Sequence, residues 1–304
     1  MVKKVMDQLE NQFLGCFIGL ASGDALGAPY EGGIIERLVW RMIGRTGDGQ
    51  MRWTDDTQMA LDLAESLLSN NGLSQDDLAM RFAKSYRWSR GYGPSAARLL
   101  KSVRNGQDWR VAAKNIYPDG SYGNGAAMRA PVLALFFREN LEVLVPNAVA
   151  AAQVTHSHPI GVDGAVLIAL ATSLLLQRQP PEQVLSAVAG HCQTTEIMAT
   201  LQVATSWLQE NRLVGSKDVA QHLGNGMTAQ KSCVTALYIA LRFLNQSFAE
   251  MMDFIIACGG DVDTLGSMAG ALWGVYNGYE QLPVVDLEQR EQLENTARRL
   301  ASRS

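Results

Sequence analysis

The sequence of 304 residues has few charged side chains and no long, uninterrupted apolar run. Charged residues make up 18% of the chain, the net charge is −4, and no block of Lys and Arg occurs. The composition therefore gives no electrostatic reason to expect binding to nucleic acid or to an anionic membrane. No apolar stretch is long enough to cross a bilayer without a charge or a glycine turn, and no signal-peptide core with a cleavage site follows the N-terminus.

Cysteine is also scarce, and the four cysteines are too far apart to form a CxxC pair: Cys16, Cys192, Cys233 and Cys258. This spacing is typical of reduced, mostly buried thiols, and it predicts a cytoplasmic protein. Zinc is not expected, because no further Cys or His joins His156 and His158 at a suitable spacing. We interpret these two histidines as contacting a ligand or satisfying a helix end.

Alternating strand patterns, linker-like stretches and internal repeats are scarce as well. Apolar residues instead recur at steps of three and four, and the hydrophobic content of 47% is ample for a core. We predict an all-α fold in a single compact domain, residues 1–304, with a loop and a short strand near residue 40 between Gly27 and Arg52. Helices are expected at about 7–22, 53–70, 74–88, 94–104, from 108, 126–137, 141–155, 160–177, 182–191, 195–210, 228–244, 247–257, 265–278 and 287–302.

Two of the expected helices carry small residues at close intervals. Gly15, Gly19 and Gly23 are four residues apart in the first. The helix after Thr264 carries Gly266, Ser267, Ala269, Gly270, Ala271 and Gly274. Small side chains let helix backbones approach closely, so both helices should pack tightly against neighbours.

Hard oxygen ligands cluster where this second helix begins. Two glycines, Gly259 and Gly260, precede Asp261, Asp263 and Thr264. The glycines allow backbone angles that other residues avoid. The carboxylates and the hydroxyl suit Mg²⁺ or Mn²⁺. The alternative is an Asp that caps an ordinary helix.

A second cluster, Thr54-Asp55-Asp56, also stands at a helix start. Four carboxylates brought together would repel one another unless cations neutralised them. If the two clusters meet, two divalent ions a few ångströms apart are the natural solution. Capping acids remain the simpler explanation for Asp55 and Asp261 taken singly.

The stretch Ser121-Tyr-Gly-Asn-Gly125 predicts a loop with bare backbone N–H groups ahead of a helix. Such a loop can cradle a phosphate or pyrophosphate, although a plain turn is the commoner outcome. It lacks the Lys-Ser/Thr of a P-loop. Asp24 and Glu31 flank a stretch with glycine and proline. Either carboxylate could act as a general acid or base from a mobile flap, or could simply be a solvated loop acid.

Together, five blocks resemble the ADP-ribosylglycohydrolases, also called ADP-ribosyl-acceptor hydrolases, which include the dinitrogenase-reductase-activating glycohydrolases. The blocks occur in the family's order and span nearly the whole chain: Gly15–Gly27, Thr54–Ala60, Gly123–Arg129, Thr155–Pro159 and Gly259–Gly266. The combination is far more specific than any one block. The resemblance implies an all-α fold of orthogonally packed helices with a binuclear Mg²⁺ or Mn²⁺ centre at the base of a cleft.

The resemblance also implies roles for individual residues. The metal ligands would be Thr54, Asp55, Asp56, Asp261, Asp263 and Thr264. Residues lining the substrate would be Tyr92, Gly93, Ser121, Gly123, Asn124, Gly125, Met128 and His156, with the glycine loop at the diphosphate. Glu31, Asp55 and Asp263 would take part in catalysis, Glu31 as a flap acid near the scissile bond.

The function implied is a hydrolase of the glycosidic bond between ADP-ribose and an acceptor, such as an arginine side chain. The partner would be an ADP-ribosylated protein or a small ADP-ribosyl compound, without nucleic acid or membrane, and the protein would act as a monomer. Alternatives are a hydrolase of a small ribosyl or nucleotide compound with the same metals, and a non-catalytic ADP-ribose-binding or crystallin-like relative.

Overall fold

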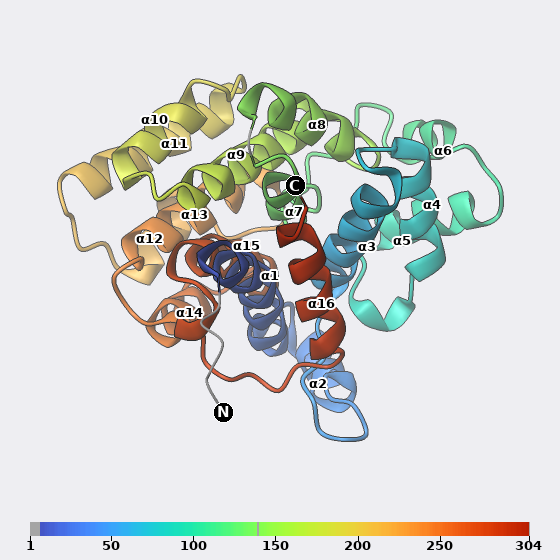
Figure 1. Cartoon of the computed structure of the whole chain (residues 1–304), viewed down its shortest axis with the longest axis horizontal. Helices are drawn as coiled ribbons and strands as arrows, with labels where there is room; N and C mark the ends of the chain where they lie inside the picture. Colours follow the sequence, from blue (N-terminus) through green and yellow to red (C-terminus); the bar gives the residue numbers. More distant parts are fainter. Residues whose placement is uncertain (1–6, 139, 304) are drawn as a thin grey trace.

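The computed structural model describes residues 7–138 and 140–303, and this part of the chain is all-α, as expected. It contains sixteen α-helices, joined by loops and four short 3₁₀ helices (Figure 1). The described residues form no strand, only isolated bridges such as Arg45–Met51 and Gly123–Thr228. The helices are α1 Gln8–Gly27, α2 Ile34–Ile43, α3 Asp55–Asn70, α4 Gln75–Ser85, α5 Pro94–Arg104, α6 Trp109–Ile116, α7 Pro131–Phe136, α8 Leu141–Gln153, α9 Pro159–Leu176, α10 Pro181–Ala189, α11 Thr195–Gln209, α12 Ser216–His222, α13 Cys233–Arg242, α14 Phe248–Cys258, α15 Val262–Asn277 and α16 Arg290–Ala301.

Helices α1 and α15 form the centre of the molecule and run antiparallel in close contact (Figure 1). A methyl carbon added at Gly19 would lie 2.3 Å from the carbonyl oxygen of Gly270, and one at Gly23 would lie 1.9 Å from that of Gly266. The two glycine stripes therefore face each other, which confirms the predicted close packing. This contact brings the end of α1 beside the start of α15, where the acidic residues are.

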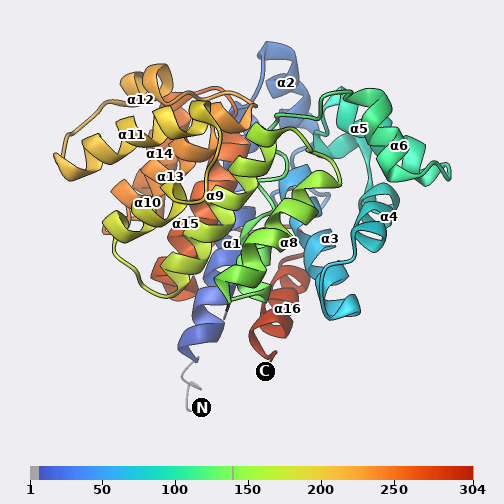
Figure 2. The same ribbon diagram turned by 90° about the horizontal axis from the view of Figure 1, so that it is seen from above.

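The other helices surround this central pair. Helices α3 to α6 pack in succession on one side, whereas α10 to α14 lie on the other (Figure 2). Helix α9 has the length and hydropathy of a membrane span, but 83% of it is buried among its neighbours. That placement is typical of a core helix.

Four segments differ from the sequence-based expectation. The strand expected near residue 40 is wrong, because α2 occupies 34–43 with most of its apolar side chains exposed. Helix α1 runs on to Gly27, because contact with α15 outweighs the low helix propensity of its glycines. Helix α7 begins only at Pro131, the first helical position, which proline favours. Helix α12 was not expected.

Candidate active site

A cavity of about 420 Å³ opens where α3, α5 and α15 begin and where the loop 117–125 passes them. All the predicted site residues except Thr54 and Tyr92 line it: Glu31, Asp55, Asp56, Gly93, Ser121, Gly123, Asn124, Gly125, Met128, His156, Asp261, Asp263 and Thr264. The structure therefore brings together segments that are more than two hundred residues apart in the sequence. A cavity of this size, lined by several polar groups, can hold a small-molecule ligand.

The two acidic clusters meet in this cavity. One carboxylate oxygen each from Glu31, Asp261 and Asp263 lies within 4.8 Å of the other two. Burial, and then the charges of Asp24, Asp55, Asp261 and Glu31, raises the pKa of Asp56 well above its usual value. The clusters are thus close enough for each to oppose ionisation of the other.

These residues fit a divalent cation. The Oδ2 atom of Asp56 is buried and has no hydrogen-bond partner. Burial, and then the charges of Glu31, Asp261 and Asp56, raises the pKa of Asp263 well above its usual value. A buried, unpaired carboxylate oxygen beside mutually repelling acids is the arrangement that a hard cation would stabilise.

Two left-handed glycines place the second cluster. Gly259 and Gly260 have φ angles of 67° and 79°, a region that favours glycine. A methyl carbon at Gly260 would lie 2.0 Å from the carbonyl oxygen of Asn225, which accepts a hydrogen bond of 2.8 Å from the N–H of Asp261. The turn at Gly259 and Gly260 can therefore pack closely against the segment before α13. This packing places Asp261 in the cavity wall.

The carboxylate of Asp24 supports the first cluster from behind. It is fully buried in α1 and accepts hydrogen bonds from the N–H of Thr54 (3.0 Å) and from the N–H and hydroxyl of Thr57 (3.1 and 2.6 Å). Burial raises its pKa to about 6, although these hydrogen bonds oppose the rise. Asp24 does not line the cavity and is buried in a helix, so it is neither a flap acid nor a solvated loop acid.

Thr54 occupies the N-cap of α3, where its hydroxyl accepts a hydrogen bond of 3.3 Å from the N–H of Asp56. It is 2% exposed and lies just behind the cavity wall. The side chain that caps α3 is therefore that of Thr54 and not that of Asp55, for which capping was the alternative. Its proposed contact with a cation remains a prediction.

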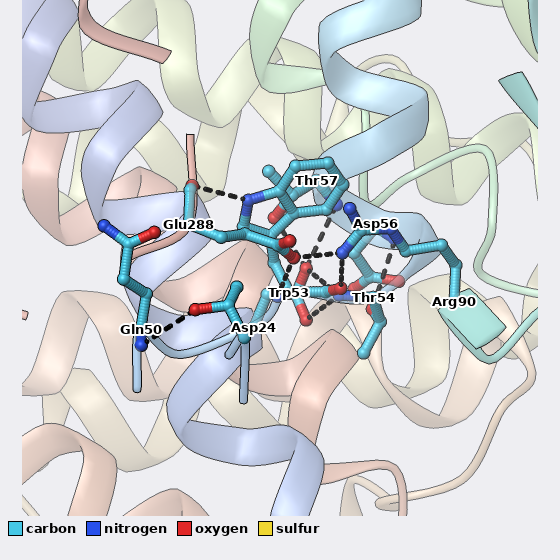
Figure 3. A network of polar contacts seen from close by, with 9 residues as sticks. Asp24, Gln50, Trp53, Thr54, Asp56, Thr57, Arg90 and Glu288 are labelled. Atoms are coloured by element: carbon cyan, nitrogen blue, oxygen red, sulfur yellow. Dashed lines mark hydrogen bonds and ion pairs between the residues drawn. The ribbon is translucent and has the colours of Figure 1, made fainter. Parts of the chain in front are cut away.

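A network that the sequence analysis missed holds the segment before Thr54 (Figure 3). The guanidinium of Arg90 forms an ion pair with Glu288, donates to the carbonyl oxygen of Trp53 (2.7 Å) and stacks 3.6 Å from the centre of the indole ring. The indole N–H of Trp53 donates to the carbonyl oxygen of Glu288 at 3.1 Å, and its backbone N–H donates to the carboxylate at 3.2 Å. The segment before α16 thereby holds in place the residues that come just before Asp55 and just before Gly91.

The glycine loop differs in detail from the predicted cradle. The N–H of Gly123 donates to the hydroxyl of Ser121 at 3.3 Å, and the N–H of Asn124 donates to the carbonyl oxygen of Met227 at 3.0 Å. A turn, not a helix start, follows Gly125. These two N–H groups are therefore not bare. Instead, the amide of Asn124 donates to Asp261 Oδ2 at 2.5 Å and ties the loop to the acidic cluster.

The two histidines have different places. His158 caps α9, where its Nδ1 accepts a hydrogen bond of 3.2 Å from the N–H of Ile160, so it satisfies a helix end as predicted. His156 lines the cavity beside the glycine loop. In the described part of the chain, the group of three or more clustered metal-type ligands consists of carboxylates from Glu31, Asp261 and Asp263.

Tyr92 does not line the cavity, and its predicted contact with the substrate stays a prediction. Its side chain is buried, with its ring 5.0 Å from that of Tyr86, while the flanking Gly91 and Gly93 line the cavity. The lining also includes Tyr117, Tyr122, Met227 and Thr228, which the sequence analysis did not single out. Only Tyr122 had a signal, since it lies within the glycine-rich motif.

The chain is similar to known proteins over nearly its whole length. The family model described as ADP-ribosylglycohydrolase matches residues 6–304. The chain belongs to this family. ADP-ribosylhydrolase ARH3 of Homo sapiens is 32% identical over 317 residues, covering 90% of this chain and 87% of that protein, and the Xenopus tropicalis protein of the same name is 30% identical over 313 residues, covering 90% and 89%.

A solved structure described as an ADP-ribosylglycohydrolase-related protein complex has a TM-score of 0.71 at 27% sequence identity. The match covers 97% of this chain and 99% of the chain in that structure. The all-α fold is therefore that of the ADP-ribosylglycohydrolases. Family membership supports a glycohydrolase that acts on ADP-ribose, and the acidic cluster could hold the metal that such an enzyme uses.

Proposed function

We propose that this protein is a metal-dependent hydrolase that cleaves the glycosidic bond between ADP-ribose and an acceptor side chain such as arginine. The observation that carries the proposal is the meeting of Glu31, Asp261 and Asp263 beside Asp55 and Asp56 in one cavity. Family membership supports the ADP-ribose part of the substrate.

Two Mg²⁺ or Mn²⁺ ions would be held by Asp55, Asp56, Asp261 and Asp263, with Thr54 and Thr264 as further oxygen donors. Bound there, such ions supply Lewis acidity and a fixed template for sugar hydroxyls and water. The protein's own contribution is to keep these carboxylates together. The carboxylates are held in place by the close packing of the glycines of α1 and α15, by the amide of Asn124 and by the carboxylate of Asp24.

The remaining cavity residues would bind and orient the substrate. Ser121, Gly123 and Gly125 would lie along the diphosphate, with Met128 and His156 beside them. The distal ribose would then lie over the acids. Water adds to its anomeric carbon, the bond to the acceptor breaks, and the acceptor leaves with a proton.

Glu31 and Asp55 are the candidates for that proton transfer. Burial, and then the charges of Asp24 and Glu31, raises the pKa of Asp55 well above its usual value. Without the cations, a carboxyl group in such a setting can hold a proton near neutral pH. Glu31 comes from the segment between α1 and α2, and its carboxylate lies within 4.8 Å of those of Asp261 and Asp263, so it would be close to the scissile bond of a ribose over the acids.

A linkage panel tests the proposal. The purified protein is given arginine-, serine- and glutamate-linked ADP-ribose, with and without Mg²⁺ or Mn²⁺, and the products are identified. Free ADP-ribose released only with the cation supports glycoside cleavage. AMP or inorganic phosphate would instead indicate phosphoryl chemistry, and calorimetric binding of ADP-ribose without turnover on any linkage would indicate a non-catalytic relative.

Asp263→Ala should lower kcat/KM by about 100-fold or more, since loss of a residue that merely supports a metal ligand already costs about 10- to 100-fold. Asp253→Ala, at an exposed position of α14, is the matched control and should behave as wild type. Cation-dependent release of ADP-ribose at the wild-type rate by Asp263→Ala would refute the site.

A further inference from the structure

Arg129 is a buried cation at the back of the cavity wall. Its side chain is 1% exposed, and none of the ion pairs found among the described residues involves it. It donates to the carbonyl oxygens of Gly125 (2.8 Å) and Ala151 (3.1 Å) and to the hydroxyl oxygen of Thr155 (2.8 Å). Burial lowers its pKa to about 9, so the group is still charged at neutral pH. Burying a cation without an acidic partner costs free energy. The presence of Arg129 here therefore points to a role for its charge at the site.

The contact with Thr155 favours one direction for the hydroxyl proton of that residue. A guanidinium only donates, so the hydroxyl oxygen of Thr155 accepts from Arg129. The hydroxyl proton is then left to find an acceptor, and Nδ1 of His156 lies 2.7 Å away. A hydrogen bond from a group that itself accepts from a cation is strengthened by that cation.

The ring of His156 is neutral in this setting. Burial, and then the charge of Arg129, lowers its pKa to about 3. A neutral imidazole carries one proton, on either Nδ1 or Nε2. A proton on Nδ1 would point at the Thr155 hydroxyl and leave the hydroxyl proton without this acceptor, which is unfavourable in a buried site. The hydrogen-bond order from Arg129 through Thr155 therefore favours the proton on Nε2.

The Nε2 atom faces the glycine loop. A methyl carbon at Gly123 would lie 3.1 Å from Nε2, and one at Gly125 would lie 3.0 Å from Nε2 and 2.7 Å from Cε1. The two glycines leave room for the ring, which forms part of the cavity lining. An N–H on Nε2 is thus presented beside the loop proposed to lie along the diphosphate.

We propose that Arg129 and Thr155 are positioning residues that hold His156 in the tautomer protonated at Nε2, so that a neutral ring donates a hydrogen bond to the anionic part of the ligand. The identity of that ligand rests on the function proposed above. The tautomer itself does not, because it follows from contacts within the protein. The relay from Arg129 through Thr155 gives the cavity a polarised hydrogen-bond donor. The imidazole of His156 adds no positive charge to a cavity in which cations are proposed to bind the acidic cluster.

Nuclear magnetic resonance on the ligand-free protein tests the tautomer. Long-range ¹H–¹⁵N correlation spectra of protein labelled with ¹⁵N-histidine distinguish a protonated ring nitrogen from an unprotonated one, and loss of signals in His156→Gln assigns the ring. We expect a protonated Nε2 and an unprotonated Nδ1. A ring protonated at Nδ1, or at both nitrogens at pH 7, would overturn the proposal.

Thr155→Val tests the relay, and Thr155→Ser is its matched control. The valine variant removes the hydroxyl, and the signals of His156 should move toward a mixture of tautomers. The serine variant keeps the hydroxyl and should retain the wild-type spectrum. If Thr155→Val does not fold, Thr155→Ala takes its place. A hydroxyl-free variant with an unchanged His156 spectrum would refute the positioning role.

Calorimetry with ADP-ribose connects the tautomer to binding. Thr155→Val should weaken affinity about five- to tenfold, the effect of one lost hydrogen bond, whereas Thr155→Ser should restore it. In turnover, KM should rise while kcat changes little. Failure of the wild-type protein to bind ADP-ribose would contradict the proposed function, and the spectra would still decide the tautomer. Equal affinity in all three proteins would contradict the role of the donor.

Discussion

The ion pair between Arg90 and Glu288 shows how single residues far from each other in the chain shape the site. Both side chains are about nine-tenths buried, and the pair is enclosed by the indole of Trp53 (Figure 3). A buried pair of this kind contributes little over an apolar replacement, but removing one partner leaves a buried charge unpaired. In this protein the ion pair instead fixes the position of the segment before Thr54.

Glu288→Gln and Arg90→Met should therefore each lower the free energy of unfolding by about 3–5 kcal/mol, and the double variant by clearly less than the sum. Urea denaturation of the four proteins gives the coupling. Calorimetry with Mn²⁺ should also show weaker binding in Glu288→Gln, because the turn that carries Asp55 and Asp56 loses its support. Strictly additive losses with unchanged Mn²⁺ affinity would show that the network does not position the site.

At this scale the sequence predicts a residue only when its own neighbours in the chain carry the signal. Asp55, Asp56, Asp261 and Asp263 stand at helix starts, where oxygen donors have a recognisable pattern, and all four line the cavity. Arg90 and Glu288 are 198 residues apart and follow no local pattern. Tyr92 sits within a turn whose glycines reach the cavity while its own ring packs inward.

Among the helices, the contact between α1 and α15 determines where the acids meet. The carbonyl oxygen of Gly270 lies 2.3 Å from where a methyl carbon at Gly19 would be, so any side chain there must push the helices apart. Close packing leaves no other route for relaxation, and overpacking of this kind costs about 1–3 kcal/mol or more.

Gly19→Ala should accordingly lower the free energy of unfolding by at least about 2 kcal/mol, although alanine is the better helix former. Gly47→Ala, at a position with open space around it and no unusual φ, is the control and should change stability by less than about 0.5 kcal/mol. Because a shift of α15 moves Asp261 and Asp263, the Gly19 variant should also bind Mn²⁺ more weakly. A Gly19→Ala protein as stable as the Gly47 variant would contradict the packing.

The element pattern shows where periodicity succeeds and where it fails. Long helices with a buried apolar face, such as α3, α9 and α11, were expected close to their observed bounds. Helix α2 was missed because its apolar residues include adjacent β-branched side chains that also suit a strand, and they lie on the protein surface. The end of α1 was placed too early because its glycines are stabilised by contact with α15, about 235 or more residues away along the chain.

For the molecule as a whole, the buried acids couple stability, pH and the proposed cations. Burial raises the pKa of Asp24 to about 6, and burial with neighbouring charges raises the pKa values of Asp55, Asp56 and Asp263 well above their usual value. The unfolded chain has aspartate pKa values near 3.9. Between these values the folded state binds more protons than the unfolded state, so the stability of the cation-free protein falls as pH rises from about 4 through 6 and beyond.

Cations bound by these carboxylates should offset that loss, and protons should compete with the cations at low pH. The rise in Tm on replacing EDTA with excess Mg²⁺ or Mn²⁺ should therefore be larger at pH 8 than at pH 5.5, as measured by scanning calorimetry.

His156, whose pKa is lowered to about 3, destabilises the fold as pH falls below about 6.5, the pKa of an unfolded histidine. This contribution is common to both conditions and cancels in the difference. Asp263→Ala should reduce the cation-induced rise at pH 8, whereas the exposed Asp253→Ala should keep it. A rise that is constant with pH, or larger at pH 5.5, would show that the carboxylates around the cavity do not hold the cation.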